Sequence, residues 1–243
     1  MGKKIVASCQ VCIRWRFCMT QWGLSEKERA FFIGGTVGPI EAILHRGAEA
    51  GCAAGKGWVA VICHPNPSQG GTMDNKVVTT LMRTYRDLGI DTLRFNFRGV
   101  GKSQGSFDKG RGELADLQAV LAWIGTGYPQ SRLLLAGFSF GSAMAAQASH
   151  EARGLAHLLL VAPPVERYAY DRGGRFPCPV SVVIGGRDEL VDAKGVHTWA
   201  AQLSPPAQLL AYPEAGHFFH GLLTTLKADL NEHLIHVLER EKA

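Results

Sequence analysis

The 243-residue sequence lacks any apolar run of about 18 residues, the length that a membrane-spanning helix requires. It also lacks a basic surplus in its main part. Lys and Arg total 26 against 21 Asp and Glu, but residues 1–25 hold four of the bases and none of the acids. The rest of the chain is therefore nearly neutral, with 22 bases against 21 acids. Neither a membrane nor a nucleic acid is expected as a partner.

The six cysteines lack the spacing of a disulfide framework or of a zinc site. Three of them form a C-x2-C-x5-C run at residues 9–18, which offers three ligands and no evident fourth. The apolar stretch before Cys9 is too short for a secretion signal. We therefore expect a cytoplasmic protein without a bound metal.

The composition is that of a globular protein, with 46% hydrophobic and 19% charged residues. The length suits one domain. Residues 1–25 are expected to form a basic, disordered N-terminal extension, and residues 26–243 a single domain.

Short apolar runs alternate with helical patterns along the chain. After a hairpin at 30–34 and 37–44, the runs that predict strands are Trp58–Cys63, Thr92–Phe97, Leu133–Ala136, His157–Val161, Val180–Ile184 and Gln208–Tyr212. Continuous apolar runs of this length are typical of strands buried on both faces of a parallel sheet. Helices are expected near 77–88, 114–124, 140–152 and 191–203, and a last helix is expected to start near Phe218. This order predicts an α/β fold with a mostly parallel central sheet and helices on both faces. In such folds, functional residues collect beyond the carboxyl ends of the strands.

The sharpest motif is Gly137-Phe138-Ser139-Phe140-Gly141, between a predicted strand and an Ala-rich helix. The pattern G-x-S-x-G in a strand-to-helix turn holds a nucleophilic serine on a strained backbone, and the glycines relieve crowding. The following helix directs its positive N-terminal end toward the serine. An ordinary strand-to-helix turn is the alternative, and the context favours Ser139 as a nucleophile.

A serine needs a base, and the base needs a carboxylate to orient it. His217 follows the last predicted strand and precedes the last predicted helix, on the same edge as Ser139; His220, expected in the first turn of that helix, is the next candidate. Asp188 follows the strand Val180–Ile184 and is favoured as the orienting carboxylate over Glu189 and Asp192. Capping a helix N-terminus is the alternative role for Asp188.

The order Ser139, Asp188, His217 along the chain is the order found in α/β-hydrolases, and residues 30–240 resemble that superfamily. The resemblance is strongest to small bacterial hydrolases without a lid, which are related in layout to dienelactone hydrolases and carboxylesterases. Further stretches that carry the resemblance are residues 64–67, 70–76 and 94–103. The resemblance implies that the Phe140 N–H is one oxyanion donor. The second donor is expected in the loop after Trp58–Cys63, where Asn66 remains because proline has no N–H. Proline replaces the glycine that relatives have at position 65. The chain between Val161 and Val180 is too short for a cap domain, so an open site is expected.

The predicted function is hydrolysis of small carboxylic esters or thioesters through an acyl-enzyme on Ser139, with a small-molecule acyl substrate as the partner and no cofactor. A peptidase or acyltransferase with the same triad is one alternative, and a hydrolase scaffold used only for binding is another. No motif specifies the acyl chain or the oligomeric state.

Overall fold

The computed structural model describes residues 27–240, which form one eight-stranded sheet. The strands are β1 (Glu28–Gly35), β2 (Gly38–His45), β3 (Trp58–Cys63), β4 (Asp91–Phe95), β5 (Arg132–Phe138), β6 (Leu155–Val161), β7 (Val180–Gly185) and β8 (Gln208–Tyr212). The predicted N-terminal extension and its three cysteines lie outside the described residues.

The sheet is mostly parallel, as the sequence predicted. Its order is β1-β2-β4-β3-β5-β6-β7-β8, in which β1 pairs with β2, and β2 pairs with β4, in antiparallel fashion. From β4 to β8 all pairs are parallel, so the carboxyl ends of these strands meet along one edge of the sheet. That edge is where β5 delivers Ser139.

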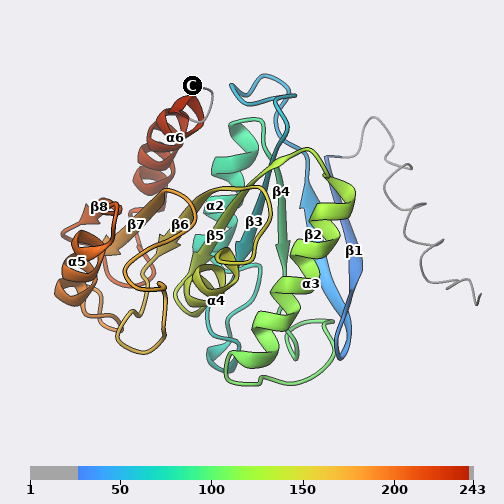
Figure 1. Ribbon diagram of the computed structural model, residues 1–243, viewed down its shortest axis with the longest axis horizontal. Helices are drawn as coiled ribbons and strands as arrows, with labels where there is room; N and C mark the ends of the chain where they lie inside the picture. Colours follow the sequence, from blue (N-terminus) through green and yellow to red (C-terminus); the bar gives the residue numbers. More distant parts are fainter. Residues whose placement is uncertain (1–26, 241–243) are drawn as a thin grey trace, which may run out of the picture.

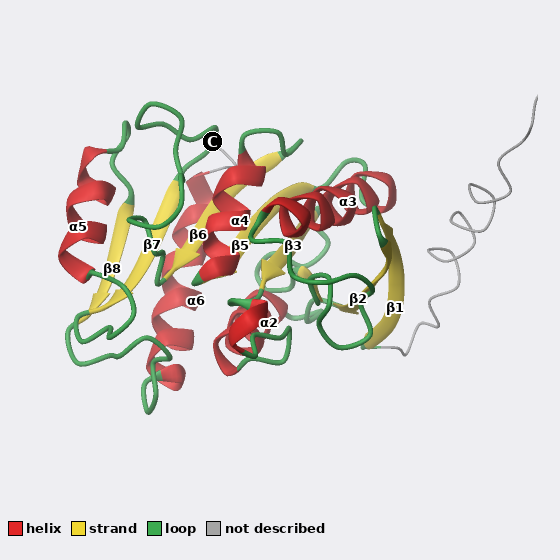
Figure 2. Cartoon of the chain, turned by 90° about the horizontal axis from the view of Figure 1, so that it is seen from below, coloured by secondary structure: helices red, strands yellow, loops and turns green. Residues whose placement is uncertain are grey.

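Helices cover both faces of the sheet (Figure 1). They are α2 (Lys76–Asp87), α3 (Arg111–Gly127), α4 (Phe140–Ser149), α5 (Ala193–Gln202) and α6 (Leu223–Arg240), and a short 3-10 helix η1 spans Pro67–Gln69. Figure 2 shows α3, α4 and α5 on one side of the sheet and α2 and α6 on the other. Each layer encloses its own apolar cluster against the sheet.

Burial follows position in the sheet. The inner strands β3 and β7 are buried at every residue, whereas the edge strands β1 and β8 leave several residues exposed. This agrees with the apolar runs of the inner strands, because a strand with helices on both faces has no side that water reaches. A two-layered apolar core of this kind makes the strand ends a rigid base for a site.

The last helix starts later than the sequence predicted. It begins at Leu223 rather than near Phe218, because Phe219 and Gly221 have positive φ values of 52° and 76° that interrupt a right-handed helix. His220 therefore lies in a turn before α6 rather than in its first helical turn.

Residues 162–179, between β6 and β7, contain no helix or strand, so no cap domain is inserted there. Aromatic contacts hold this segment against α4 and α5. The Tyr170 ring meets Trp199 at 5.4 Å, and the Phe176 ring stacks on His150 at 5.3 Å. The Trp199 indole also donates to Asp171 at 2.8 Å. We name residues 162–179 the β6–β7 loop.

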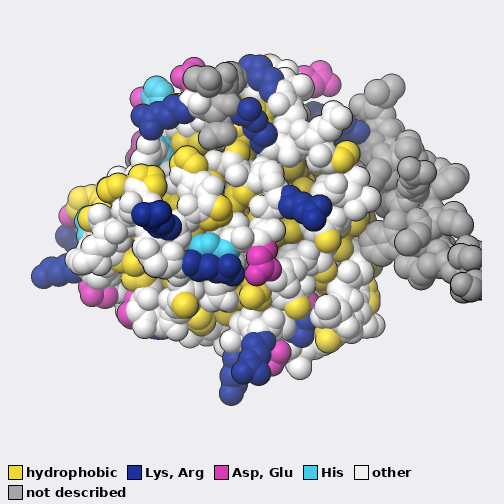
Figure 3. Space-filling view, viewed as in Figure 1, with side chains coloured by type: hydrophobic (Ala, Val, Ile, Leu, Met, Phe, Trp, Pro, Cys, Tyr) yellow, Lys and Arg dark blue, Asp and Glu magenta, His cyan; other side chains and the backbone are white. Residues whose placement is uncertain are grey.

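Among the described residues, no helix has the length and apolarity that crossing a membrane demands. On the face in Figure 3, Lys and Arg side chains lie scattered among apolar and uncharged surface.

Candidate active site

Ser139 lies on a strained turn between β5 and α4. Its φ of 53° and ψ of −120° lie outside the usual range for a residue with a side chain. The turn is held because the Ser139 N–H donates to the Val161 carbonyl at 2.8 Å. A methyl group on Gly137 would overlap the Gly141 carbonyl, and one on Gly141 would overlap the carbonyls of Cys63 and His64. Both glycines of the motif are therefore required by close backbone approach.

A chain of hydrogen bonds joins the three residues that the sequence singled out. The Ser139 Oγ lies 3.0 Å from His217 Nε2, and His217 Nδ1 lies 2.9 Å from Asp188 Oδ2 and 3.1 Å from Oδ1. His217 is buried, with 2% of its surface exposed, and its ring lies 5.0 Å from the Phe138 ring. The three side chains come from the ends of β5, β7 and β8, so the parallel sheet assembles them from distant parts of the chain.

Asp188 is held by more than the histidine. Its Oδ1 accepts from the N–H groups of Leu190 and Val191, both at 2.9 Å. The N-cap of α5 is Asp192, whose carboxylate accepts from Lys194 and Gly195. The structure thus separates the two roles that the sequence left open, since Asp192 caps the helix and Asp188 faces His217.

The other nearby candidates have different partners. Glu189 accepts the backbone N–H of His217 at 3.1 Å and so holds the histidine loop. His220 is exposed and contacts the Phe218 ring rather than Ser139.

The predicted oxyanion donors lie at two neighbouring backbone positions. Phe140 is the first residue of α4, and Asn66 follows the end of β3, whose partner strand is β5. The Gly141 backbone packs against the carbonyls of Cys63 and His64, which brings the two segments together. Within residues 27–240 neither N–H has an acceptor in the protein.

The sequence did not single out a polar pair beneath the nucleophile. The Ser142 hydroxyl donates to the Ser139 carbonyl at 2.5 Å and lies 2.8 Å from the Tyr170 hydroxyl. Burial raises the pKa of Tyr170 well above its usual value, so this hydroxyl stays protonated. The link ties the β6–β7 loop to the serine turn. No local pattern reveals it, because the two residues are 28 positions apart.

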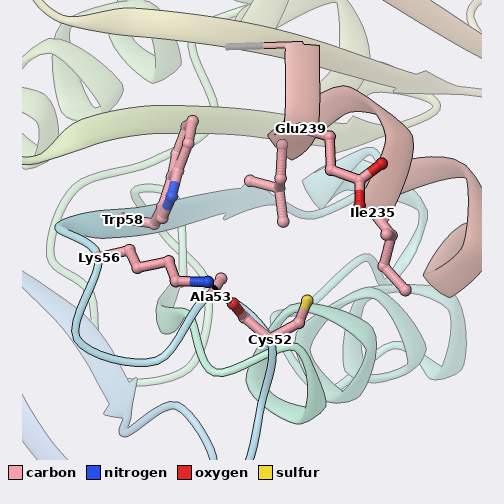
Figure 4. Close-up of a pocket in the computed structure, with 7 residues that line it drawn as sticks. Cys52, Ala53, Lys56, Trp58, Ile235 and Glu239 are labelled. Atoms are coloured by element: carbon pink, nitrogen blue, oxygen red, sulfur yellow. Dashed lines mark hydrogen bonds between the residues drawn. The ribbon is translucent and has the colours of Figure 1, made fainter. Parts of the chain in front are cut away.

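A pocket of about 170 Å³ lies elsewhere in the molecule (Figure 4). It is lined by Cys52, Ala53, Lys56, Trp58, Ile235, Leu238 and Glu239. Trp58 opens β3, so this pocket lies at the amino ends of the parallel strands, opposite to the edge with Ser139. In the described part of the chain, no group of three or more His, Cys, Asp or Glu side chains is arranged to hold a metal ion.

Known proteins resemble this chain over most of its length. A family model described as serine aminopeptidase, S33, matches residues 61–171. An uncharacterized protein of Rickettsia prowazekii is 36% identical over 187 residues, which cover 73% of this chain and 78% of that protein.

Two solved structures share both sequence and fold with the chain. An alpha-beta serine hydrolase homologue from Coxiella burnetii is 40% identical, with a TM-score of 0.81, over 87% of this chain and all of that one. A serine hydrolase without lid from Xanthomonas campestris is 36% identical, with a TM-score of 0.80, over 89% of this chain and 96% of that one. The chain belongs to the α/β-hydrolase superfamily, among its small serine hydrolases without a lid.

Proposed function

We propose that this hydrolase cleaves small carboxylic esters or thioesters through an acyl-enzyme on Ser139. The observation that carries the proposal is the unbroken hydrogen-bonded chain from Ser139 Oγ through the His217 ring to Asp188. A serine hydroxyl that donates to a buried imidazole, itself oriented by a carboxylate, is the arrangement that makes serine nucleophilic near neutral pH.

In the proposed reaction, Ser139 Oγ attacks the carbonyl carbon of the substrate while its proton passes to His217 Nε2. Asp188 accepts the His217 Nδ1–H, which leaves the Nε2 lone pair facing the serine and stabilises the imidazolium that forms. His217 then gives the proton to the departing alcohol or thiol. Water, deprotonated by His217, attacks the acyl-enzyme and releases the acid.

The negative oxygen of the tetrahedral intermediate is assigned to the N–H groups of Phe140 and Asn66. Both are backbone donors, and both lack a protein acceptor within the described residues, so binding the oxyanion breaks no existing hydrogen bond. The N-terminal end of α4 adds favourable positive potential at the same point.

The proposed substrates are small or accessible acyl compounds. The β6–β7 loop is packed onto α4 and α5 and forms no cap domain, so no segment of this loop provides a long enclosed acyl channel. Esters and thioesters fit this open arrangement, and neither requires a cofactor for hydrolysis by a serine triad.

The direct test is labelling with a fluorophosphonate, read by intact mass and peptide mapping. We expect one adduct on Ser139 in the wild-type protein and none in Ser139→Ala, and hydrolysis of p-nitrophenyl acetate and of an acetyl thioester by the wild type alone. Circular dichroism of Ser139→Ala controls for folding. Turnover that persists in folded Ser139→Ala would refute the assignment, and a folded wild type without adduct or turnover would favour a binding role for the scaffold.

Peptide hydrolysis is the second candidate, because the matching family model is described as a serine aminopeptidase. A panel of aminoacyl fluorophores distinguishes the two activities. Release of the fluorophore with kcat/KM above that for esters would favour a peptidase. Product transfer to an added alcohol would instead indicate an acyltransferase.

A further inference from the structure

His64 directly follows β3 and is fully buried beside the proposed oxyanion loop. Its two ring nitrogens both have backbone partners. Nδ1 lies 2.7 Å from the Pro65 carbonyl oxygen, and Nε2 lies 3.0 Å from the Phe97 nitrogen. The mechanism described above uses neither contact, and the ring also lies 4.8 Å from the Phe97 ring, so a role other than proton transfer is sought for it.

The two contacts fix the tautomer of the ring. The backbone N–H of Phe97 can only donate a hydrogen bond, so Nε2 of His64 must be the acceptor. The Pro65 carbonyl can only accept, so Nδ1 must carry the hydrogen. Burial lowers the pKa of His64 to about 4, so the ring is neutral at neutral pH and its Nε2 lone pair is available. The His64 ring therefore links the end of β3 to the backbone of Phe97, and the ring has a single orientation.

The contact with Pro65 determines the direction of the next N–H. The peptide bond between Pro65 and Asn66 is trans, so its C=O and N–H point in opposite directions. His64 draws the carbonyl into the buried interior. The Asn66 N–H must then point away from the His64 ring, and among residues 27–240 no acceptor meets it.

The following peptide is fixed as well. The Asn66 carbonyl accepts from the N–H groups of Gly71 at 3.0 Å and Gln69 at 3.1 Å. A methyl group on Gly71 would overlap the Pro65 carbonyl, so that carbonyl is enclosed between His64 and Gly71. With both flanking peptides held, the Asn66 N–H cannot turn without breaking several hydrogen bonds.

We propose that His64 is a positioning residue that aims the Asn66 N–H at the oxyanion by holding the Pro65 carbonyl. The inference rests on the proposed function and deepens it. Pro65 is buried, so its carbonyl oxygen needs a hydrogen-bond donor from the protein. His64 supplies that donor from the adjacent residue.

Two amide variants separate the two contacts of the ring. In His64→Asn, the side-chain nitrogen lies as far from Cβ as Nδ1 does, so it can still donate to Pro65 but cannot reach Phe97. In His64→Gln, the terminal oxygen lies as far from Cβ as Nε2 does, so it can accept from Phe97 but cannot hold Pro65. Both variants replace the ring with an uncharged amide, and each is the matched control for the other.

With p-nitrophenyl acetate, we expect His64→Asn to keep kcat within about threefold of wild type. His64→Gln should lose kcat by about 10- to 100-fold with little change in KM, since an oxyanion donor acts in the transition state. A role in stability alone would lower the melting temperature of the two variants without this split. If His64→Gln does not fold, His64→Met serves as the donor-free variant of similar length.

A double-mutant cycle with Asn66→Pro, which removes the N–H itself, provides the decisive test. Once the N–H is gone there is nothing to aim, so His64→Gln should add no further loss of kcat to Asn66→Pro. A further loss of tenfold or more in the double variant would overturn the proposal, as would wild-type kcat in folded His64→Gln or a large loss in folded His64→Asn. If the wild type itself neither reacts with fluorophosphonate nor hydrolyses the ester, the proposed function fails instead.

Discussion

Replacing Asn66 by proline removes one backbone N–H from the proposed oxyanion site and puts the ring Cδ in the place of the hydrogen, so both changes act against a bound oxyanion. The φ of Asn66 is −52°, which lies within the range of about −65 ± 15° that the proline ring imposes. The carbonyl of residue 66 keeps its hydrogen bonds to Gln69 and Gly71. Because the N–H has no acceptor among the described residues, its removal breaks none of their hydrogen bonds.

The expected cost appears in the transition state. Loss of one oxyanion donor lowers kcat by about 100- to 1,000-fold, equivalent to about 3–4 kcal/mol. The KM for p-nitrophenyl acetate should change much less, because the ground-state carbonyl binds these donors weakly. Steady-state kinetics and single-turnover acylation measure the two terms separately.

Asn66→Ala is the matched control, because it keeps the N–H. Both variants lose the Asn66 Oδ1 contacts with the N–H and hydroxyl of Ser68, each 2.9 Å in the wild type. That capping interaction contributes about 1 kcal/mol to stability and none to the oxyanion. Asn66→Ala should therefore lose a few-fold of kcat at most. Equal kcat for the folded proline and alanine variants would refute the assignment of this N–H.

Three further predictions test other parts of the site and the core. Asp188→Asn should lower kcat by about 10⁴-fold. The side-chain oxygen of the asparagine keeps the two backbone donors, so its NH2 group faces His217 Nδ1 and imposes the wrong tautomer on the histidine. An unchanged rate would contradict the role of the carboxylate. Gly141→Ala should lower the free energy of unfolding, measured by urea titration, by about 3 kcal/mol, because the added methyl group overlaps two carbonyl oxygens. Gly125→Ala is the control: this glycine lies in α3 with open space around it, so the change should be neutral or stabilising. Burial lowers the pKa of His157 from 6.5 to about 3, so the unfolded chain binds more protons between these values, and His157 should remove about 1.4 kcal/mol of stability per pH unit as the pH drops below 6.5. Burial also lowers the pKa of His45 and His64 to about 4, and each adds a slope of the same sign. In urea titrations, His157→Gln should therefore reduce the pH slope of the wild type by about 1.4 kcal/mol per pH unit, and an unchanged slope in this variant would contradict the reasoning.

The sequence predicted the sheet well because burial leaves a strong signal. Strands β3 and β8 occupy the predicted residues, and each strand from β3 to β8 was identified from its continuous apolar run. The positions of Ser139, Asp188 and His217 followed from the same logic, since each stands just beyond a predicted parallel strand. The fold then has to bring them to one edge of the sheet.

Long-range polar contacts were beyond such reasoning. His64 and Phe97 are 33 positions apart, and Ser142 and Tyr170 are 28 apart, so no spacing rule links them. The predicted start of α6 was wrong because of the positive φ at Phe219. A residue with a side chain adopts this conformation only where tertiary packing holds it there, and the local sequence does not show that packing. Phe219 is fully buried, and its ring packs against Tyr212 at 5.8 Å.

The anchoring of the β6–β7 loop has a consequence for kinetics. Tyr170 joins this loop to the nucleophile through Ser142, and Trp199 and His150 hold it from α5 and α4. An enzyme whose covering segment must swing aside responds to an oil–water interface with a jump in rate. Here the corresponding segment is fastened to the serine turn itself, so the rate should follow the concentration of monomeric ester and level off smoothly as micelles appear. We therefore expect the anchored loop to favour dissolved ester molecules over aggregated ones as substrates.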